Sequence, residues 1–175
     1  MIFYFSGTGN SFEAARTIAS ITHDQLVDIG AAFKEGRVDY IAEQGTNLGF
    51  VFPTHCWSTP RIVDDFLAKL IIMGPNGRPF VPGFSFVVVT CGGFVGNTAR
   101  FFEKLLWKNQ GIRLDSSFSI QNVDNCIFLM GPGSPEKQKQ LQRQAHQAAR
   151  QIGYLIDGKR IPHQETRNAF GSLMS

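Results

Sequence analysis

The chain has 175 residues, 43% of them hydrophobic, which is enough for one domain with a single core and makes a second independent domain unnecessary. Its formal charge of +3, from 17 basic and 14 acidic residues, includes no basic block, and this argues against nucleic-acid binding. The three cysteines, Cys56, Cys91 and Cys126, lack C-x-x-C spacing, which argues against a disulfide framework, a zinc site and an iron–sulfur cluster.

The amino-terminal third of the chain alternates apolar runs with helical patterns, as strand and helix units around a parallel sheet do. Residues 2–5 form a short apolar strand, and after a glycine-containing loop apolar side chains recur at helical spacing over 12–19. A second strand is expected over 25–29. The stretch 30–46 is polar and poorly periodic, so its helix is not assigned.

The middle third repeats the alternation. Residues 48–52 form a buried strand that ends at Pro53, and Thr59 then fits an N-cap with Pro60 at the first helical position. The core face of that helix is expected over 62–70. Residues 84–90 are the most strand-like segment, because 86–89 are β-branched or aromatic throughout, and we expect this strand at the centre of the sheet.

In the last third, Asn97 is expected to cap a helix with apolar positions over 99–106, and 118–123 forms a fifth strand. Ser134 and Pro135 then open a final helix, whose charged run over 137–150 is a solvated face. From 157 onward the composition becomes polar and aperiodic. We therefore expect one domain over 1–156 and a carboxy-terminal tail over 157–175.

The alternation predicts an α/β fold in which ligands bind beyond the carboxyl ends of the strands, where the strand order reverses. Three loops come together there, and they follow the first, third and fourth strands. The first combines hydroxyl and amide side chains with two glycines and leads directly into a helix N-terminus, a pattern that indicates phosphate binding by backbone amides and hydroxyls. This loop consists of Ser6, Gly7, Thr8, Gly9, Asn10 and Ser11.

Other phosphate-binding motifs do not fit these residues. A Walker loop needs Lys after its last glycine, where this chain has Asn10, and a dinucleotide fingerprint needs a third glycine, where it has Phe12. A receiver domain would need acidic residues after the first strand and an Asp after the third, where the chain has Ser6 and Pro53. A C-x5-R phosphatase loop also fails, because only four residues separate Cys56 from Arg61.

The first loop resembles the phosphate motif of flavodoxins, which bind flavin mononucleotide (FMN). Two further segments are similar to the flavin-ring loops of that family, above all in its branch fused to bacterial-type ferredoxins. They are Phe52-Pro53-Thr54-His55-Cys56-Trp57 and Val89-Thr90-Cys91-Gly92-Gly93. The resemblance covers 1–156 and implies a flavodoxin-like three-layer sandwich with a five-stranded parallel sheet of order 2-1-3-4-5.

The resemblance also implies roles for single residues. The flavin ring would lie between the second and third loops, with Trp57 stacked against it. Asn97 would complete the cofactor-binding set, which otherwise consists of the first loop, Pro53, Thr54, His55, Cys56, Thr90, Cys91, Gly92 and Gly93. His55 is either a modulator of proton uptake or a solvated loop residue, and Cys56 and Cys91 are either a redox pair or small buried side chains. Phe94 covers the other flavin edge or lies in the core or at its rim.

Two features depart from the family pattern. The chain lacks the closely spaced cysteines that two iron–sulfur clusters of the fused branch would require. Its sequence pI is about 8.9, whereas flavodoxins are acidic. We therefore expect a stand-alone or truncated module, and its basic charge argues against the usual basic redox partners.

Three functions remain open at this stage. The first is a bacterial, cytoplasmic electron carrier that exchanges electrons with a ferredoxin-like protein or a reductase, with no catalytic residue and no metal. The second is an FMN-dependent NAD(P)H:quinone-type oxidoreductase, and the third is the same fold without a cofactor. No apolar run approaches the roughly 18 residues of a membrane span, and we expect a monomer or weak dimer without nucleic-acid or membrane partners.

Overall fold

The computed structural model describes residues 1–123 and 133–158, so Cys126 and most of the expected tail lie outside the described residues. The elements in chain order are β1 (Ile2–Tyr4), α1 (Asn10–Thr22), β2 (Leu26–Asp28), α2 (Ile29–Lys34), β3 (Asp39–Ile41), β4 (Asn47–Pro53), α3 (Arg61–Leu67), β5 (Ile71–Met73), the short 3-10 helix η1 (Pro75–Gly77), β6 (Phe84–Cys91), α4 (Thr98–Gln110), β7 (Ser116–Gln121) and α5 (Pro135–Asp157). The fifth predicted strand is thus shifted by two residues, and the last helix ends one residue later than expected. The division into a domain and a tail at residue 156 stays a prediction.

Five strands form one parallel sheet in the order β2-β1-β4-β6-β7, which is 2-1-3-4-5 when only the strands of this sheet are counted. This confirms the predicted topology. The central strand is β4, which pairs with β1 on one side and β6 on the other. The prediction that 84–90 forms the central strand is wrong. An unbroken apolar run indicates that a strand is buried on both faces, and since β4 and β6 are both buried in this way, the pattern does not tell them apart.

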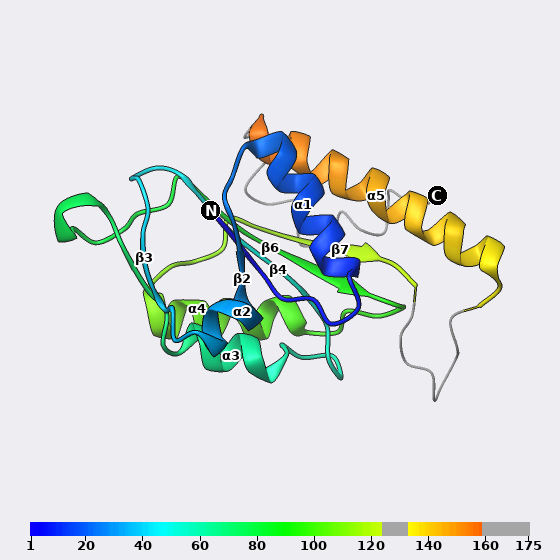
Figure 1. Cartoon of the computed structure of the whole chain (residues 1–175), viewed down its shortest axis with the longest axis horizontal. Helices are drawn as coiled ribbons and strands as arrows, with labels where there is room; N and C mark the ends of the chain where they lie inside the picture. Colours follow the sequence, from blue (N-terminus) through cyan, green and yellow to red (C-terminus); the bar gives the residue numbers. More distant parts are fainter. Residues whose placement is uncertain (124–132, 159–175) are drawn as a thin grey trace.

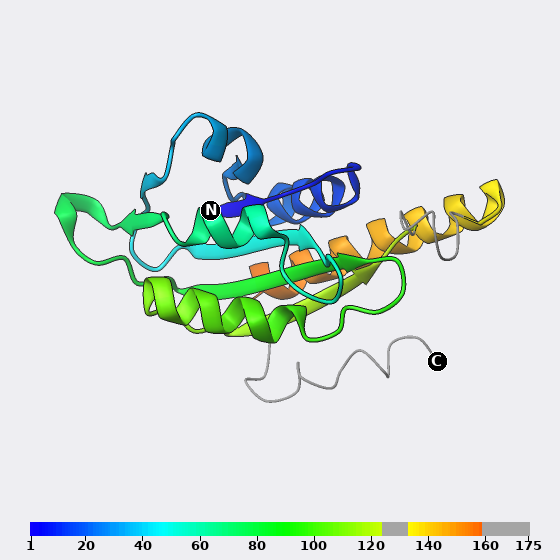
Figure 2. The ribbon, with the colours of Figure 1, turned by 90° about the horizontal axis from the view of Figure 1, so that it is seen from below.

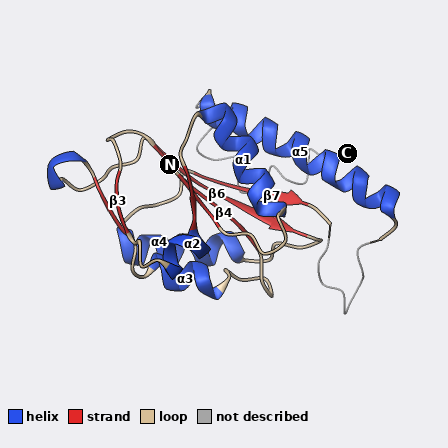
Figure 3. Cartoon of the chain, in the orientation of Figure 1, coloured by secondary structure: helices blue, strands red, loops and turns tan. Residues whose placement is uncertain are grey.

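Helices cover both faces of the sheet in three layers (Figures 1 and 2). On one face α1 and α5 pack over a core that contains Ile18, Val88 and Ile152. On the other face α2, α3 and α4 cover a second core rich in aromatic side chains, in which the ring centres of Phe50 and Phe102 lie 4.8 Å apart. The secondary structure in Figure 3 shows the same separation. The three-layer sandwich is therefore confirmed.

A glycine in the central strand makes room for an aromatic side chain in the core under α1 and α5. Gly49 of β4 lies opposite Phe86 of β6, and a Cβ atom at Gly49 would come within 2.3 Å of the Phe86 ring. Phe86 is fully buried, so its ring fills the space above Gly49. The absence of a side chain there is what allows a phenylalanine in the neighbouring strand.

The stretch 30–46, for which no helix or strand was predicted, contains most of α2 and all of β3. Asp28 caps α2, since its Oδ1 accepts a hydrogen bond of 3.1 Å from the Ala31 amide. β3 pairs with β5 in a separate two-stranded parallel sheet. These elements have only three to six residues, which is too short for hydrophobic periodicity to reveal.

The predicted helix starts are partly wrong. Pro60, not Thr59, is the N-cap of α3, and that helix ends at Leu67, so the buried Leu70 lies beyond it. Asn97 is the N-cap of α4 by position, but its side chain makes no capping hydrogen bond. Only the start of α5 follows the expectation in full, with the Ser134 hydroxyl accepting from the Lys137 amide.

Candidate functional site

The loops that follow β1, β4 and β6 lie at the same end of the sheet, at the carboxyl ends of its central strands (Figure 1). Strand order reverses between β1 and β4, since the chain leaves β1 towards β2 on one side and reaches β4 on the other. In open α/β sheets this is where ligands bind. The three loops predicted from the sequence therefore meet at the expected place.

The first loop exposes its backbone at the start of α1. Gly7, Thr8 and Gly9 are exposed, and Gly9 is the N-cap of α1 with φ of 94°. The Gly9 amide donates a 3.0 Å hydrogen bond to Ser6 Oγ, which folds the loop into a tight turn. The N-cap Gly9 makes no side-chain capping bond, so among the described residues no side chain accepts from the first amides of α1. Such a helix end favours an anion.

Ser11 does not belong to the exposed part of this loop. Its side chain is buried, and its Oγ lies 2.7 Å from Thr90 Oγ1 at the end of β6. Thr90 is buried as well. This hydrogen bond joins the first turn of α1 to the strand that leads into the third loop. The structure therefore places Ser11 where it fixes the position of the first loop, and its contact with a phosphate stays a prediction.

Asn10 lies at the other side of the loop. Its Nδ2 is 3.4 Å from the Val123 carbonyl, beyond the end of β7. The first loop is thus held by Ser11 towards β6 and by Asn10 towards β7.

The second loop is a tight turn with an unusual backbone. His55 and Ser58 exchange two backbone hydrogen bonds of 2.9 and 3.0 Å, and the two residues between them, Cys56 and Trp57, have φ of 48° and 60°. Left-handed φ values at both central positions define a type I′ turn, which normally requires Gly, Asn or Asp. A Trp and a Cys in this conformation are strained, and such strain gathers at functional sites.

The second loop is fixed against the third at two points. Thr54 Oγ1 lies 2.7 Å from Thr98 Oγ1, and the Thr54 amide continues the β4 and β6 pairing by donating to the Thr90 carbonyl. Further along, a Cβ atom at Gly96 would come within 2.5 Å of Trp57 Cβ. Trp57 thus lies against the Gly96 backbone while 66% of its surface remains exposed. Its stacking on a flavin stays a prediction.

The third loop starts where β6 and β7 separate. Cys91 is half-buried, with its Sγ 3.6 Å from the Gly93 carbonyl, whereas Cys56 is exposed. Gly93 and Asn97 are exposed, and the Gly92 carbonyl accepts a 3.0 Å hydrogen bond from the Gln121 side chain. Pro53, the last residue of β4, is half-buried. Every predicted site residue thus lies in one of the three loops or at a strand end beside them.

Phe94 is the aromatic side chain of this loop, and 82% of its surface is exposed. Together with Trp57 it gives the carboxyl edge of the sheet an exposed aromatic surface. His55 is also exposed, and its ring centre lies 6.2 Å from that of Phe5.

Sequence reasoning missed two residues that shape this edge, Gln121 and Asn122. Asn122 is buried, and its amide donates to the Cys91 carbonyl at 2.8 Å. Gln121 is the last residue of β7 and Asn122 follows it, and the pattern of ligand loops did not include this strand end. The available signal was the pair of amide side chains directly after Ile120.

A half-buried carboxylate in the helix that follows the second loop was missed as well. Asp64 stands in the first turn of α3, and its Oδ1 is buried without a hydrogen-bond partner in the described part of the chain. Burial raises the pKa of Asp64 above its ordinary value, and a hydrogen bond from the Thr59 side chain opposes that rise. Asp64 is thus easier to protonate than a surface aspartate.

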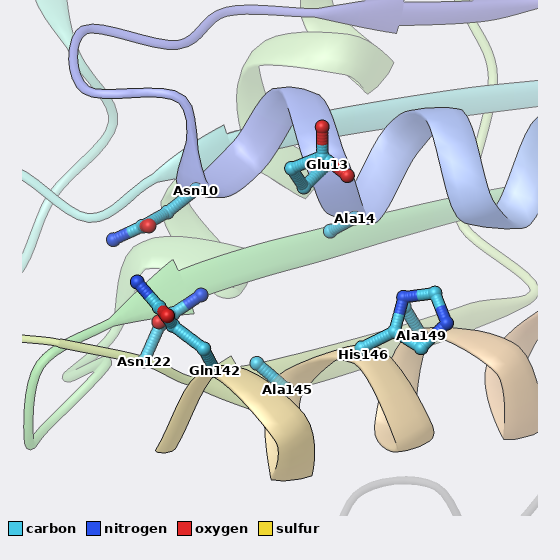
Figure 4. Close-up of a pocket in the computed structure, with 8 residues that line it drawn as sticks. All are labelled: Asn10, Glu13, Ala14, Asn122, Gln142, Ala145, His146 and Ala149. Carbon is cyan, nitrogen blue, oxygen red and sulfur yellow. The ribbon is translucent and has the colours of Figure 1, made fainter. Parts of the chain in front are cut away.

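A cavity of about 250 Å³ lies between α1 and α5 and reaches Asn122, just beyond β7. Figure 4 shows its lining residues, which come from α1, from α5 and, at Asn122, from the chain just after β7. They are Asn10, Glu13, Ala14, Asn122, Gln142, Ala145, His146 and Ala149. The cavity shares Asn10 with the phosphate loop but includes no residue of the second or third loop.

Solved structures with the same fold are similar to this chain. An azoreductase from Bacillus anthracis str. Sterne is 11% identical, with a TM-score of 0.50 over 87% of this chain and 97% of its own. An FMN-dependent NADH-azoreductase from Bacillus anthracis str. Ames Ancestor, in complex with FMN, is 8% identical, with a TM-score of 0.50 over 89% and 98%. A flavodoxin from Streptococcus pneumonia TIGR4 is 17% identical, with a TM-score of 0.45 over 86% and 97%.

No protein-family model matches the sequence, and no curated protein sequence matches it either. The sheet order and the two structures with a TM-score of 0.50 define the fold of this chain as flavodoxin-like. Among the described residues, no helix is long and apolar enough to cross a membrane, and no group of three metal-binding side chains is found.

Proposed function

We propose that this chain binds FMN non-covalently and works as an electron carrier between redox proteins in the bacterial cytoplasm. The observation that carries the proposal is the uncapped N-terminus of α1, presented by an exposed loop at the strand-order reversal. Amides and a helix dipole at such a point bind a phosphate without any cationic side chain. One solved structure of the same fold contains FMN.

The residues present fit the phosphate group. Gly7 and Gly9 let the backbone approach an anion closely, and the φ of 94° at Gly9 is one that residues with a side chain rarely adopt. Ser6 Oγ already accepts from the Gly9 amide, so its own proton is the one it can donate. The exposed Thr8 hydroxyl adds a further donor at the tip of the loop.

The ring of the cofactor would lie against the second and third loops. FMN supplies the electron-accepting and electron-donating chemistry, which protein side chains lack. The part of the chain is to bind and orient the ring and to limit its contact with water. Trp57, held against Gly96, provides the apolar surface for this purpose.

The exposed aromatic surface favours a carrier. Trp57 and Phe94 are 66% and 82% exposed at the edge where the ring would lie. Exposed apolar surface beside a redox group is suited to brief contact with a protein partner, because electrons pass across the interface and no substrate pocket is needed. The partner would be a ferredoxin-like protein or a reductase.

Turnover with small acceptors tests the carrier assignment. The FMN-loaded protein, freed of excess cofactor, is mixed with NADH or NADPH and a quinone or an azo dye. We expect no faster oxidation of the nicotinamide than with the same concentration of free FMN, and rapid electron transfer to cytochrome c once the flavin has been photoreduced with EDTA as the electron donor. Nicotinamide-dependent turnover well above the free-FMN control would make the chain a reductase instead.

A further inference from the structure

The two-stranded sheet has an unpaired edge. β3 and β5 are held by hydrogen bonds from the Ile71 amide to the Val38 carbonyl, 2.8 Å, and from the Ala42 amide to the Met73 carbonyl, 2.9 Å. In a parallel pair these bonds use every second residue of a strand, so Tyr40 also faces β5. The backbone amides and carbonyls of the two remaining residues, Asp39 and Ile41, therefore point away from it, and within residues 1–123 and 133–158 they have no partner.

The side chains of β3 separate in the same way. Tyr40 points into the core, where its ring centre lies 5.0 Å from that of Phe3. Ile41 points outward and is 74% exposed, and Ile71, which lies opposite Asp39 in β5, is 50% exposed. An unpaired edge strand with an exposed apolar side chain is a template for pairing with another strand.

We infer that a second copy of this chain pairs with β3, antiparallel and about a two-fold axis at Tyr40, so that two small sheets join into one of four strands. In this register Asp39 of each copy lies opposite Ile41 of the other. These are the residues whose amides and carbonyls point outward, so each of the two pairs exchanges two hydrogen bonds. The strand is thus complementary to itself.

Charge selects this register over its neighbours. With the axis at Tyr40, Arg37 of each copy lies opposite Glu43 of the other, which places opposite charges together at both ends. A shift by two residues in one direction would place Asp39 opposite Asp39, and in the other direction Asp39 opposite Glu43. Like charges directly opposite one another destabilise a strand pair. Arg37 now bonds the exposed Glu35, at 2.6 Å between Nε and Oε2, and an exposed pair of this kind is easily exchanged.

The dimer is expected to be weak. The strand has three residues with short flanking segments, and stable interfaces bury at least about 1,200 Å² of total surface. β3 also lies at the far end of the molecule from the loops of the candidate site (Figure 1). The pairing therefore leaves the FMN site open, and it stands or falls independently of the proposed function.

Sedimentation velocity of the full chain, with and without FMN, tests the pairing over protein concentrations from about 10 µM to about 1 mM. We expect the weight-average sedimentation coefficient to rise towards that of a dimer. Ile41→Pro removes an outward amide that has no partner within the copy, and Ile41→Lys places a charge on the apolar face. Both are expected to keep the protein monomeric, whereas Leu155→Lys, at a residue of α5 that is 41% exposed, is the control that leaves the dimer unchanged.

A charge exchange tests the register. Arg37→Glu and Glu43→Arg should each weaken the dimer several-fold, and the double variant should restore it, because the opposite charges face one another again. FMN binding should be the same in all of these variants. A chain that stays monomeric up to about 1 mM, or a dimer that tolerates Ile41→Pro and Ile41→Lys, would overturn the inference. If the double variant does not dimerise more strongly than the two single variants, the proposed register is wrong.

Discussion

We predict that the hydrogen bond between Ser11 and Thr90 stabilises the folded protein by fixing the phosphate loop to the sheet. Both side chains are almost fully buried, at 1% and 3% exposure, and their oxygens are 2.7 Å apart. Ser11→Ala leaves the Thr90 hydroxyl buried without its partner. That costs about 1–3 kcal/mol of unfolding free energy, the usual penalty for an orphaned buried polar group.

The double variant isolates the interaction. Ser11→Ala with Thr90→Val removes both hydroxyls and keeps the shape at position 90, so it should be clearly more stable than the sum of the two single losses predicts. We expect a coupling free energy of about 1 kcal/mol or more. Urea denaturation of the apo-protein measures it, and the melting temperature of Ser11→Ala should fall by about 4–8 °C for a loss of about 2 kcal/mol.

Ser20→Ala provides the control on the same helix. The Ser20 hydroxyl is at an exposed position and bonds only to the Thr17 carbonyl one turn earlier, so its removal should cost no more than about 0.5 kcal/mol. Purely additive losses at Ser11 and Thr90, or a Ser11→Ala protein as stable as the parent, would refute the view that this bond fixes the loop to the sheet.

Three further changes test other parts of the site. Gly96→Ala would place a Cβ atom against Trp57, so both the Trp fluorescence and the affinity for FMN should change. Gly36→Ala is the control, because Gly36 has φ of 69° but open space around it, and the substitution should cost only the backbone strain. Equal effects of the two substitutions on Trp fluorescence and FMN affinity would contradict the contact. Asp64→Asn should raise the urea midpoint at pH 7. The pKa of Asp64 is higher in the native state than its unfolded value of about 3.8, so the carboxylate lowers the free energy of unfolding as the pH rises from 3.8 through the native pKa, and asparagine carries no such charge. That gain should vanish below pH 3.8, where both states are protonated, and a gain that persists there would mean that the carboxylate charge is not its cause. Thr8→Val should weaken FMN binding about tenfold or more with little loss of stability, and unchanged affinity in a fluorescence titration would mean that the phosphate lies elsewhere.

The sheet could be predicted from the sequence because its strands carry local signals. The runs at 48–52 and 84–90 are apolar on both faces, and turns and helix patterns separate them. α2, β3 and β5 could not, since three- to six-residue elements are set by tertiary packing. Tyr40, for example, is held in β3 by its contacts with Phe3 and Phe66, far away in the sequence.

The candidate site was predictable in its loops but not in its details. The order of hydroxyls and glycines in the first loop is visible in the letters, but the burial of Ser11 depends on Thr90, 79 residues away. Nothing in the letters Cys56 and Trp57 indicates positive φ, since these residues rarely adopt it. Their conformation follows from the close fit of the second loop against Gly96.

Binding of FMN to the purified apo-protein is the measurement that tests the central claim most directly. Flavin fluorescence is followed while folded apo-protein is titrated with FMN, with riboflavin, which lacks the phosphate, as the matched ligand. The account predicts saturation at one FMN per chain and much weaker binding of riboflavin, because the amides at the start of α1 contact the phosphate. A folded protein that binds neither ligand, or that binds riboflavin as tightly as FMN, would contradict it.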